Sequence, residues 1–254
     1  MRSPIFSLVL RILSHYALED FFIHTFSRFT FTFYFLLRTQ AYILWDWNGT
    51  LLDDVDAQVA SLNAMLTRRG HRPVTRQFFC DNFAFPARTF YRLVGMDVPD
   101  SEWDALAKEY HDTYHVQSYG LNRGAFAALE LVKRQGAGQS VISALHQFYL
   151  DLETNQYGVQ PFMDHIYGVD NFDGGSKLSR ARELLALFRS TTTTSNYNFI
   201  LIGDSIHDFE VANELGTRCV LFSGGSHSRA RLERFAPVGD TLSECVRLAF
   251  KSQV

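Results

Sequence analysis

Residues 41–54 read AYILWDWNGTLLDD and place Asp46 directly after an apolar run. The first four residues have the unbroken apolar character of a buried strand, and Asn48-Gly49-Thr50 is typical of a turn. A carboxylate is costly to bury without a partner. Asp46, at the end of a buried strand, therefore indicates a functional group rather than a residue that only shapes the turn.

Helical periodicity dominates residues 53 to about 120, and no strand is expected there. We expect three helices: one from Val55 that Asp53 or Asp54 caps and Gly70 ends, one over residues 87–95, and one that begins at Ser101 with the capping box Ser101-Glu102-Trp103-Asp104.

From about residue 120 onward, helical and β-rich segments alternate. We expect helices over residues 122–135, 176–188 and 205–215, a loop over 190–196, a strand that ends at Ser143, further strands over 166–169 and 199–202, and a last strand over 219–222. Strands separated by helices predict an α/β fold with a parallel sheet that is covered on both faces.

Ligands of such sheets bind beyond the carboxyl ends of the strands. The residues at these ends are Asp46, Ser143, the stretch 170–177 with Lys177, and Gly203-Asp204. Carboxylates that converge at one edge repel each other unless a cation lies between them. Because all-oxygen ligation with open positions favours Mg²⁺, the strand ends predict a magnesium site.

Composition limits the class of protein. The 254 residues allow one large domain, or a core with a smaller inserted domain. A net charge of -3 gives no electrostatic case for a nucleic-acid partner, and the three widely separated cysteines suggest a reducing compartment, the cytoplasm. Charged residues interrupt every apolar run in residues 1–40 before the ~18 residues of a membrane span. We interpret this segment as an unstructured or spurious extension, with a transit peptide or an extra strand over 29–33 as alternatives.

Four motifs, in this order, resemble those of haloacid-dehalogenase-type (HAD) phosphatases. Asp46-Trp47-Asn48-Gly49-Thr50-Leu51 resembles the first, an aspartate followed by x-Asp-Gly-Thr, and the stretch from Gly203 to Asp208, GDSIHD, resembles the fourth. Ser143 and Lys177 match the second and third. Four motifs in register are a specific signal. The likeness spans residues 41 to about 240 and is strongest to phosphoglycolate-phosphatase-like members. It implies a Rossmann-like core of residues 41–53 and 121–254, with a helical cap over 54–120.

The resemblance also implies a mechanism and a partner, a small phosphorylated metabolite. Asp46 would attack phosphorus and form an aspartyl-phosphate that water then cleaves. Ser143 would hydrogen-bond a phosphoryl oxygen, and Lys177 would neutralise developing charge. Mg²⁺ would be held by the acidic cluster and one main-chain oxygen, namely Asp46, Asp204, Asp208 and the carbonyl of Asn48.

Asn48 departs from the family pattern. Family phosphatases carry there an aspartate that protonates the leaving group and later activates water. An amide can hydrogen-bond but cannot exchange a proton in the working pH range. General acid-base help is typically worth about 10²–10⁴ in rate. Two hypotheses therefore remain: a phosphatase that is slow or obtains its proton elsewhere, and a regulatory phosphate-sensing protein that has lost turnover.

Three further interpretations concern basic residues. A phosphonoacetaldehyde-hydrolase-like enzyme would need a cap lysine for a Schiff base, and between residues 53 and 120 only Lys108 is available. Arg88, Arg92 and Arg123 are candidates either for binding a substrate anion or for ordinary surface charge. His146 and His207 are interpreted as solvent-facing residues, with a position near the site as the alternative.

Removal of residues 1–38 is expected to leave the melting temperature and any phosphatase activity nearly unchanged, because every motif and the first core strand lie beyond them. Thermal unfolding and phosphate release, compared between the full and the shortened chain, check this expectation. An insoluble shortened chain would instead show that the aromatic residues of this segment pack on the core.

Overall fold

The computed structural model describes residues 40–170, 176–191 and 197–251. The expectations for residues 1–39 and for the loop at 192–196 lie outside these described residues. The strands are β1 (Gln40–Trp45), β2 (Leu52–Asp53), β3 (Gly120–Leu121), β4 (Gly138–His146), β5 (Ile166–Val169), β6 (Tyr197–Gly203), β7 (Arg218–Phe222) and β8 (Val238–Gly239). The helices are α2 (Val55–Arg68), α3 (Arg76–Asn82), α4 (Ala87–Leu93), α5 (Asp100–Tyr114), α6 (Ala125–Arg134), α7 (Gln147–Gln156), α8 (Leu178–Thr191), α9 (Ile206–Leu215), α10 (Arg229–Leu232) and α11 (Leu242–Phe250), with a 3-10 turn η1 (Gln160–Phe162).

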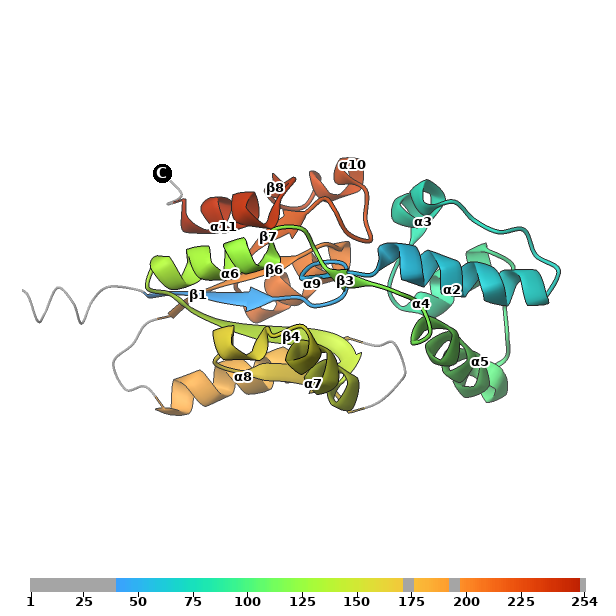
Figure 1. Cartoon of the computed structure of the whole chain (residues 1–254), viewed down its shortest axis with the longest axis horizontal. Helices are drawn as coiled ribbons and strands as arrows, with labels where there is room; N and C mark the ends of the chain where they lie inside the picture. Colours follow the sequence, from blue (N-terminus) through green and yellow to red (C-terminus); the bar gives the residue numbers. More distant parts are fainter. Residues whose placement is uncertain (1–39, 171–175, 192–196, 252–254) are drawn as a thin grey trace, which may run out of the picture. The chain divides into compact units, whose positions relative to one another are not determined.

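Six strands form one sheet in the order β5-β4-β1-β6-β7-β8 (Figure 1). The pairs β5–β4, β4–β1, β6–β7 and β7–β8 run parallel. At the centre, the backbone N–H of Asp46 donates to the carbonyl of Ile202 at 2.9 Å, so the end of β1 is tied to β6. The expected α/β fold with a Rossmann-like parallel sheet is confirmed.

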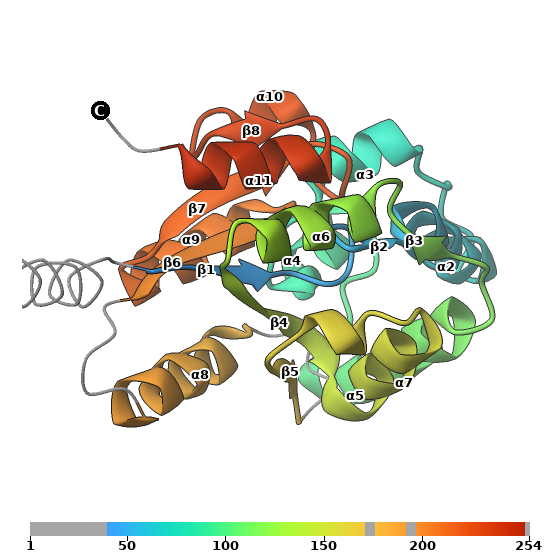
Figure 2. The same cartoon turned by 60° about the vertical axis from the view of Figure 1, so that its left-hand side comes forward.

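Strand β1 shows why the sheet needs helices on both sides. Ile43 and Trp45 pack into the hydrophobic cluster that includes α6 and α11, whereas Tyr42 and Leu44 pack into the cluster that includes α8 and α9. Figures 1 and 2 show α6 and α11 side by side along one face of the sheet. Because successive side chains point to opposite faces and both faces are covered, every position of the strand core is apolar.

The helices between the first two motifs form a hydrophobic cluster of their own. Helices α2 to α5 bury apolar side chains against one another, among them Leu62, Phe79, Phe90 and Leu106. The short strands β2 and β3 pair antiparallel, with Leu52 opposite Leu121. The segment that leads into the helices therefore lies beside the segment that leads back to the sheet. Within the described residues, no helix is both long enough and apolar enough to cross a membrane.

Three expected boundaries are wrong. Strand β4 does not end at Ser143 but runs to His146, with an irregular register between Ile142 and His146. Helix α5 begins at Asp100 rather than Ser101, and its N-cap is Pro99, which makes no side-chain cap. The expected capping box is therefore absent at this end, because proline already holds the φ angle that suits a helix start and Ser101 lies inside the first turn. Helix α6 likewise begins at Ala125, later than expected.

Several elements were not expected. Strand β8 follows the strand predicted to be the last, and the short strands β2 and β3 lie at the two ends of the segment predicted to be helical throughout. Four helices were missed, namely α3, α7, α10 and α11. In α7 the apolar periodicity is weak because its buried positions include Glu153 and Thr154 beside Leu150. A buried acid on a helix face removes the signal that sequence patterns rely on.

Glu153 anchors the loop that follows Asp46. The indole N–H of Trp47 donates to Glu153 Oε2 at 2.6 Å, and the hydroxyl of Tyr119 donates to Oε1 at 2.9 Å. Trp45, two residues earlier, donates instead to the neutral side-chain carbonyl of Gln139 at 2.9 Å. Both tryptophans are completely buried.

This pair allows a matched stability test. Trp47→Phe should cost about 1.5–3 kcal/mol beyond the packing loss, because it removes a hydrogen bond to a charged group, whereas the corresponding loss in Trp45→Phe should be about 0.5–1.5 kcal/mol. Burial raises the pKa of Glu153, so urea unfolding of both variants at the same alkaline pH measures the two free energies of unfolding. Equal losses would show that the Glu153 contact does not hold the loop.

Candidate active site

The residues at the strand ends come together in one cavity of about 190 Å³. Asp46 follows β1, Ser143 lies within β4, Lys177 precedes α8 and Asp204 follows β6, and all four line the cavity. Each is buried, with at most 8% of its surface exposed. These side chains lie far apart in the sequence. They meet because the carboxyl ends of parallel strands lie at the same edge of the sheet.

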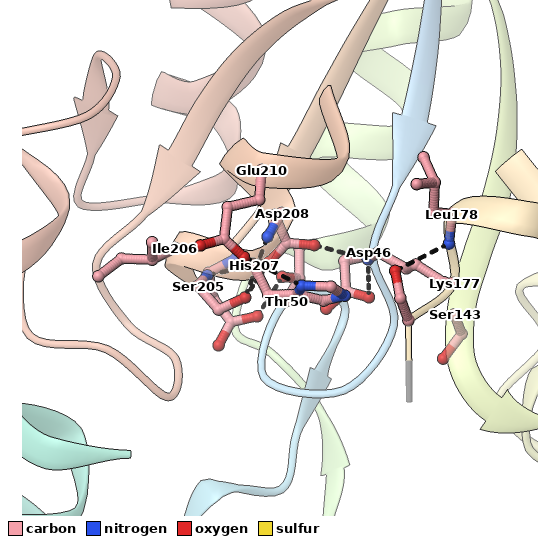
Figure 3. A network of polar contacts seen from close by, with 12 residues as sticks. Asp46, Thr50, Ser143, Lys177, Leu178, Ser205, Ile206, His207, Asp208 and Glu210 are labelled. Atoms are coloured by element: carbon pink, nitrogen blue, oxygen red, sulfur yellow. Dashed lines mark hydrogen bonds and ion pairs between the residues drawn. The ribbon is translucent and has the colours of Figure 1, made fainter. Parts of the chain in front are cut away.

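Three carboxylates and one ammonium form the centre of this cavity (Figure 3). Asp46, Asp204 and Asp208 each offer an oxygen atom, and these atoms lie within 4.8 Å of one another. The Nζ of Lys177 lies 2.5 Å from Asp46 Oδ1 and 2.6 Å from Asp208 Oδ1. When all three carboxylates are ionised, the one ammonium leaves a buried excess of two negative charges. One divalent cation with oxygen ligands would neutralise that excess, so the donor set fits Mg²⁺.

The pKa values of the three acids shift in different directions. Burial raises the pKa of Asp46 well above its ordinary value, although Lys177 opposes the shift. Burial, reinforced by the charge of Asp208, raises the pKa of Asp204 to about 6. Burial acts on Asp208 too, but its ion pair with Lys177 outweighs it and lowers the pKa of Asp208. One ammonium therefore cannot stabilise the ionised forms of all three carboxylates, and the pKa values of Asp46 and Asp204 stay raised.

Asp204 is held by contacts that sequence reasoning missed. The hydroxyl of Thr50 donates to Oδ1 at 2.8 Å, and the backbone N–H of Ser226 donates to Oδ2 at 2.5 Å. A Cβ atom at Gly49 or Gly225 would collide with this carboxylate. The signal that could have revealed Ser226 is the run Gly224-Gly225-Ser226 shortly after β7, again beyond the carboxyl end of a strand.

Asp208 and Ser143 have backbone partners as well. Asp208 Oδ2 accepts the N–H groups of Asp204 and Ser205 at 3.1 and 2.9 Å, and Ser205 caps α9 in a capping box with Asp208. One oxygen of Asp208 therefore builds the helix start while the other meets Lys177 (Figure 3). The Oγ of Ser143 accepts the N–H of Leu145 at 3.0 Å, so its own O–H remains a donor at the cavity wall.

Asn48 points its amide nitrogen at a buried carboxylate. Its Nδ2 donates to Asp54 Oδ2 at 2.9 Å and to the Tyr114 hydroxyl oxygen at 3.2 Å. Asp54 is completely buried and accepts three further hydrogen bonds, from the Gly49 N–H at 2.7 Å, Gln58 Nε2 at 3.0 Å and the Tyr114 O–H at 2.7 Å. Asp54 precedes α2 but makes no side-chain cap, so the expected capping role is wrong.

The histidine and lysine interpretations can now be compared with the structure. His207 is not solvent-facing: its side chain is 14% exposed, lines the cavity, and lies 4.9 Å from the ring of Phe85. His146 lines the cavity too, and its Nδ1 accepts the N–H of Phe148. Lys108 has a side chain that is 75% exposed and paired with Asp112 at 2.6 Å, and it does not line the cavity. The structure offers no support for a Schiff-base role of Lys108.

The fold and the site have relatives among known proteins. Among solved structures, the chain is similar to a haloacid dehalogenase-like hydrolase from Streptococcus pneumoniae, with 17% identity and a TM-score of 0.67 over 83% of this chain and 98% of that one. It is also similar to a predicted phosphatase from Clostridium acetobutylicum, with 17% identity and a TM-score of 0.63 over 83% and 98%. A predicted phosphoglycolate phosphatase from Haemophilus somnus 129pt shares 15% identity, with a TM-score of 0.62 over 84% and 99%.

At these identities the solved structures establish the fold. A search of curated proteins finds no match. The family model described as haloacid dehalogenase-like hydrolase matches residues 43–222, which include all four motifs. The resemblance read from the motifs is therefore confirmed, and the chain belongs to the haloacid dehalogenase-like hydrolase family.

Proposed function

We propose that this protein is a Mg²⁺-dependent phosphatase that cleaves a small-molecule phosphate ester through an aspartyl-phosphate on Asp46. The observation that carries the proposal is the buried set of Asp46, Asp204, Asp208 and Lys177, with its excess of two negative charges, at the wall of a cavity. Membership of the hydrolase family and the phosphatase names of structural relatives support it.

In the proposed reaction, Asp46 is the nucleophile. Its carboxylate oxygen bonds to phosphorus while the bond from phosphorus to the leaving-group oxygen breaks, and water then cleaves the aspartyl-phosphate to release phosphate. The ion pair with Lys177 orients Asp46 through Oδ1, so little orientational freedom is lost during attack. Lys177 and the O–H of Ser143 would bind the phosphoryl oxygens.

The metal would be held by the carboxylates of Asp46, Asp204 and Asp208 together with the backbone carbonyl of Asn48. When bound, it supplies positive charge that lets an anionic nucleophile approach an anionic phosphate. Thr50 and Ser226 hold Asp204 in place for this purpose through their hydrogen bonds to its two oxygens. Asp208 keeps its second oxygen on Lys177 and so links the metal site to the phosphate site.

We propose that helices α2 to α5 form the cap over this site, within residues 54–120. The cavity is lined from both sides, by the acids of the sheet edge and by residues such as Phe85 and Trp103 of the helical segment. Arg231, in α10, donates to the carbonyls of Cys80 and Phe83 at 2.8 and 2.9 Å, which fastens α3 to the sheet domain. A cap in this position excludes water from the reacting phosphate.

Asp46→Asn should abolish turnover while leaving the protein folded, because the amide cannot form the phospho-enzyme. Phosphate release from a panel of small phosphomonoesters, with and without Mg²⁺, measures this. Beryllium or aluminium fluoride with Mg²⁺ should raise the melting temperature of the wild type but not of the variant, through ligand linkage. Asp112→Asn, the same change at an exposed acid, is the control and should keep full activity. If Asp46→Asn kept most of its activity, the covalent mechanism would be wrong.

The contact between Asn48 and Asp54 changes how the missing acid can be restored. Asn48→Asp alone would set two buried carboxylates against each other where a 2.9 Å hydrogen bond now lies. The double variant Asn48→Asp/Asp54→Asn exchanges acid and amide and keeps that hydrogen bond. We expect the double variant to hydrolyse an alkyl phosphate up to ~10²-fold faster than the wild type, about 2.7 kcal/mol of barrier, with a smaller gain for an aryl phosphate.

The reason lies in the leaving group. An alkoxide leaves poorly unless it is protonated as it departs, whereas a phenolate is a much weaker base and needs little help. Rates for one alkyl and one aryl phosphate, at saturating Mg²⁺, in the wild type, both single variants and the double variant, test this expectation. Equal gains for both substrates, or none, would mean that another group already donates the proton.

A further inference from the structure

The cap side of the cavity is an aromatic wall. Seven aromatic side chains of α3 to α5 and their connections line it. Six of them contact one another in pairs: Phe83 with Phe85 at 5.2 Å between ring centroids, Tyr91 with Trp103 at 5.7 Å, and Tyr110 with Tyr114 at 5.8 Å. Pairs of contacting rings restrict each other's rotamers, so the wall is largely preformed.

The wall is also uncharged. Burial raises the pKa of Tyr91 and of Tyr110 above the ordinary value, so both phenols stay protonated. Among the described residues that line the cavity, Lys177 alone is a lysine or arginine, and it is already committed to Asp46 and Asp208. His111 and His207 also line the cavity, but burial lowers the pKa of both, which disfavours their cationic forms. The cavity therefore has a lysine at the phosphate end and, among the described residues, no lysine or arginine at the leaving-group end.

The three candidate arginines lie elsewhere. Arg88 forms an ion pair with Asp100, and its guanidinium lies 4.7 Å from the ring centroid of Trp103 without lining the cavity. Arg92 pairs with Asp97 at 3.0 Å, and Arg123 is exposed. None of the three lines the cavity, so their interpretation as surface charge fits better than the anion-binding one.

A second anion on the substrate would meet an unfavourable site. It would lie against aromatic rings and would share the cavity with Asp54, Asp204 and Asp208. A charge buried without a partner carries a large desolvation cost, and nearby like charges add to it. An aromatic ring, in contrast, loses little by leaving water and gains contacts with the rings of the wall. A preformed apolar cavity of about 150 Å³ holds benzene. The 190 Å³ found here also includes the phosphate end, so it suits a substrate with no more than one ring.

We propose that the substrate is a phosphate ester of an uncharged aromatic alcohol, whose ring packs on the wall of Phe85, Tyr91, Trp103 and Tyr110, and not a carboxylate-bearing phosphate such as phosphoglycolate. The proposal rests on the phosphatase function proposed above and names its substrate class. It also agrees with Asn48, because a phenolate leaves without an acid at that position.

Phenyl phosphate and 4-carboxyphenyl phosphate test the proposal in the full-length protein with Mg²⁺ at pH 8. Both release a phenol, and the carboxylate-bearing phenol is the slightly weaker base, so leaving-group chemistry alone favours it. We expect kcat/KM for phenyl phosphate to be higher by at least about tenfold, a factor that corresponds to roughly 1.4 kcal/mol. Equal values, or a preference for the carboxylated ester, would overturn the substrate class while leaving the phosphatase function intact.

A binding measurement tests the substrate class separately from the phosphatase function. Phenylphosphonate and phosphonoacetate have no leaving group and cannot be turned over by this reaction. With Mg²⁺, phenylphosphonate should raise the melting temperature more than phosphonoacetate does, through ligand linkage. The opposite order would overturn the substrate class even in a catalytically silent protein. If no phosphate ester is hydrolysed, the phosphatase proposal fails, and the phosphonate order still reports on the cavity.

A variant that adds a positive charge to the aromatic wall tests whether the lack of charge causes the preference for an uncharged ester. Ala107 lies on α5 between Trp103 and Tyr110, one turn from each, and lines the cavity. Ala107→Arg should narrow or reverse the preference by improving kcat/KM for 4-carboxyphenyl phosphate, because it supplies the missing cation. Ala107→Gln adds length without charge and should keep the wild-type order. Ala87→Arg, at a second lining position, serves if Ala107→Arg does not fold. An unchanged preference in a folded arginine variant would show that charge does not set the specificity.

Discussion

The ion pairs of Lys177 with Asp46 and Asp208 are the interactions on which the rest of this site depends. They join the end of β1, the start of α8 and the start of α9 in a largely buried region at the wall of the cavity. Buried charges destabilise a fold when they lose their partners, so Lys177 could not be lost without leaving three carboxylates to repel one another. Even with Lys177 present, two negative charges remain uncompensated. Metal binding and folding stability should therefore be linked in this protein.

Asp54 connects the loop after β1 with both ends of the helical segment. It immediately precedes α2, its oxygens hold Asn48 and Gly49, and Tyr114 at the end of α5 donates to it. The Tyr114 hydroxyl oxygen accepts from Asn48 as well. Any displacement of α5 relative to this loop would break contacts of Asn48, so the side chain two residues after the proposed nucleophile is coupled to the position of the helices above it.

The parts of the fold that could be predicted were those with a strong local signal. The strand before Asp46 and the strand before Asp204 are buried on both faces, so their residues are apolar without interruption and were recognised. The motif residues Asp46, Lys177, Asp204 and Asp208 were singled out because each lies at a strand end or a helix start. Ser143 was singled out through its motif, although it lies within β4, and the structure places all five in one cavity.

What could not be predicted depends on contacts between distant residues. Glu153 looks like a surface acid of a weakly periodic helix, and its reason for burial is Trp47, more than a hundred positions away. Ser226 acts through its backbone N–H, so its side chain gives no sign of the contact and only the preceding glycine pair marks the position. Asp54 was taken for a helix cap because local rules favour aspartate there, but its partners Asn48 and Tyr114 decide otherwise.

The bonds that complete the site also determine when it can form. Thr50 and Asp204 are 154 positions apart, and Cys80 and Arg231 are 151 apart, so these contacts close very long loops. The cluster of α2 to α5, in contrast, contains only residues between Val55 and Leu106. During synthesis at about 5–20 residues per second, this segment emerges on the order of ten seconds before Arg231 does. The helical segment can thus bury its apolar side chains first, whereas the contacts of the acidic site can be completed only after Ser226 has emerged.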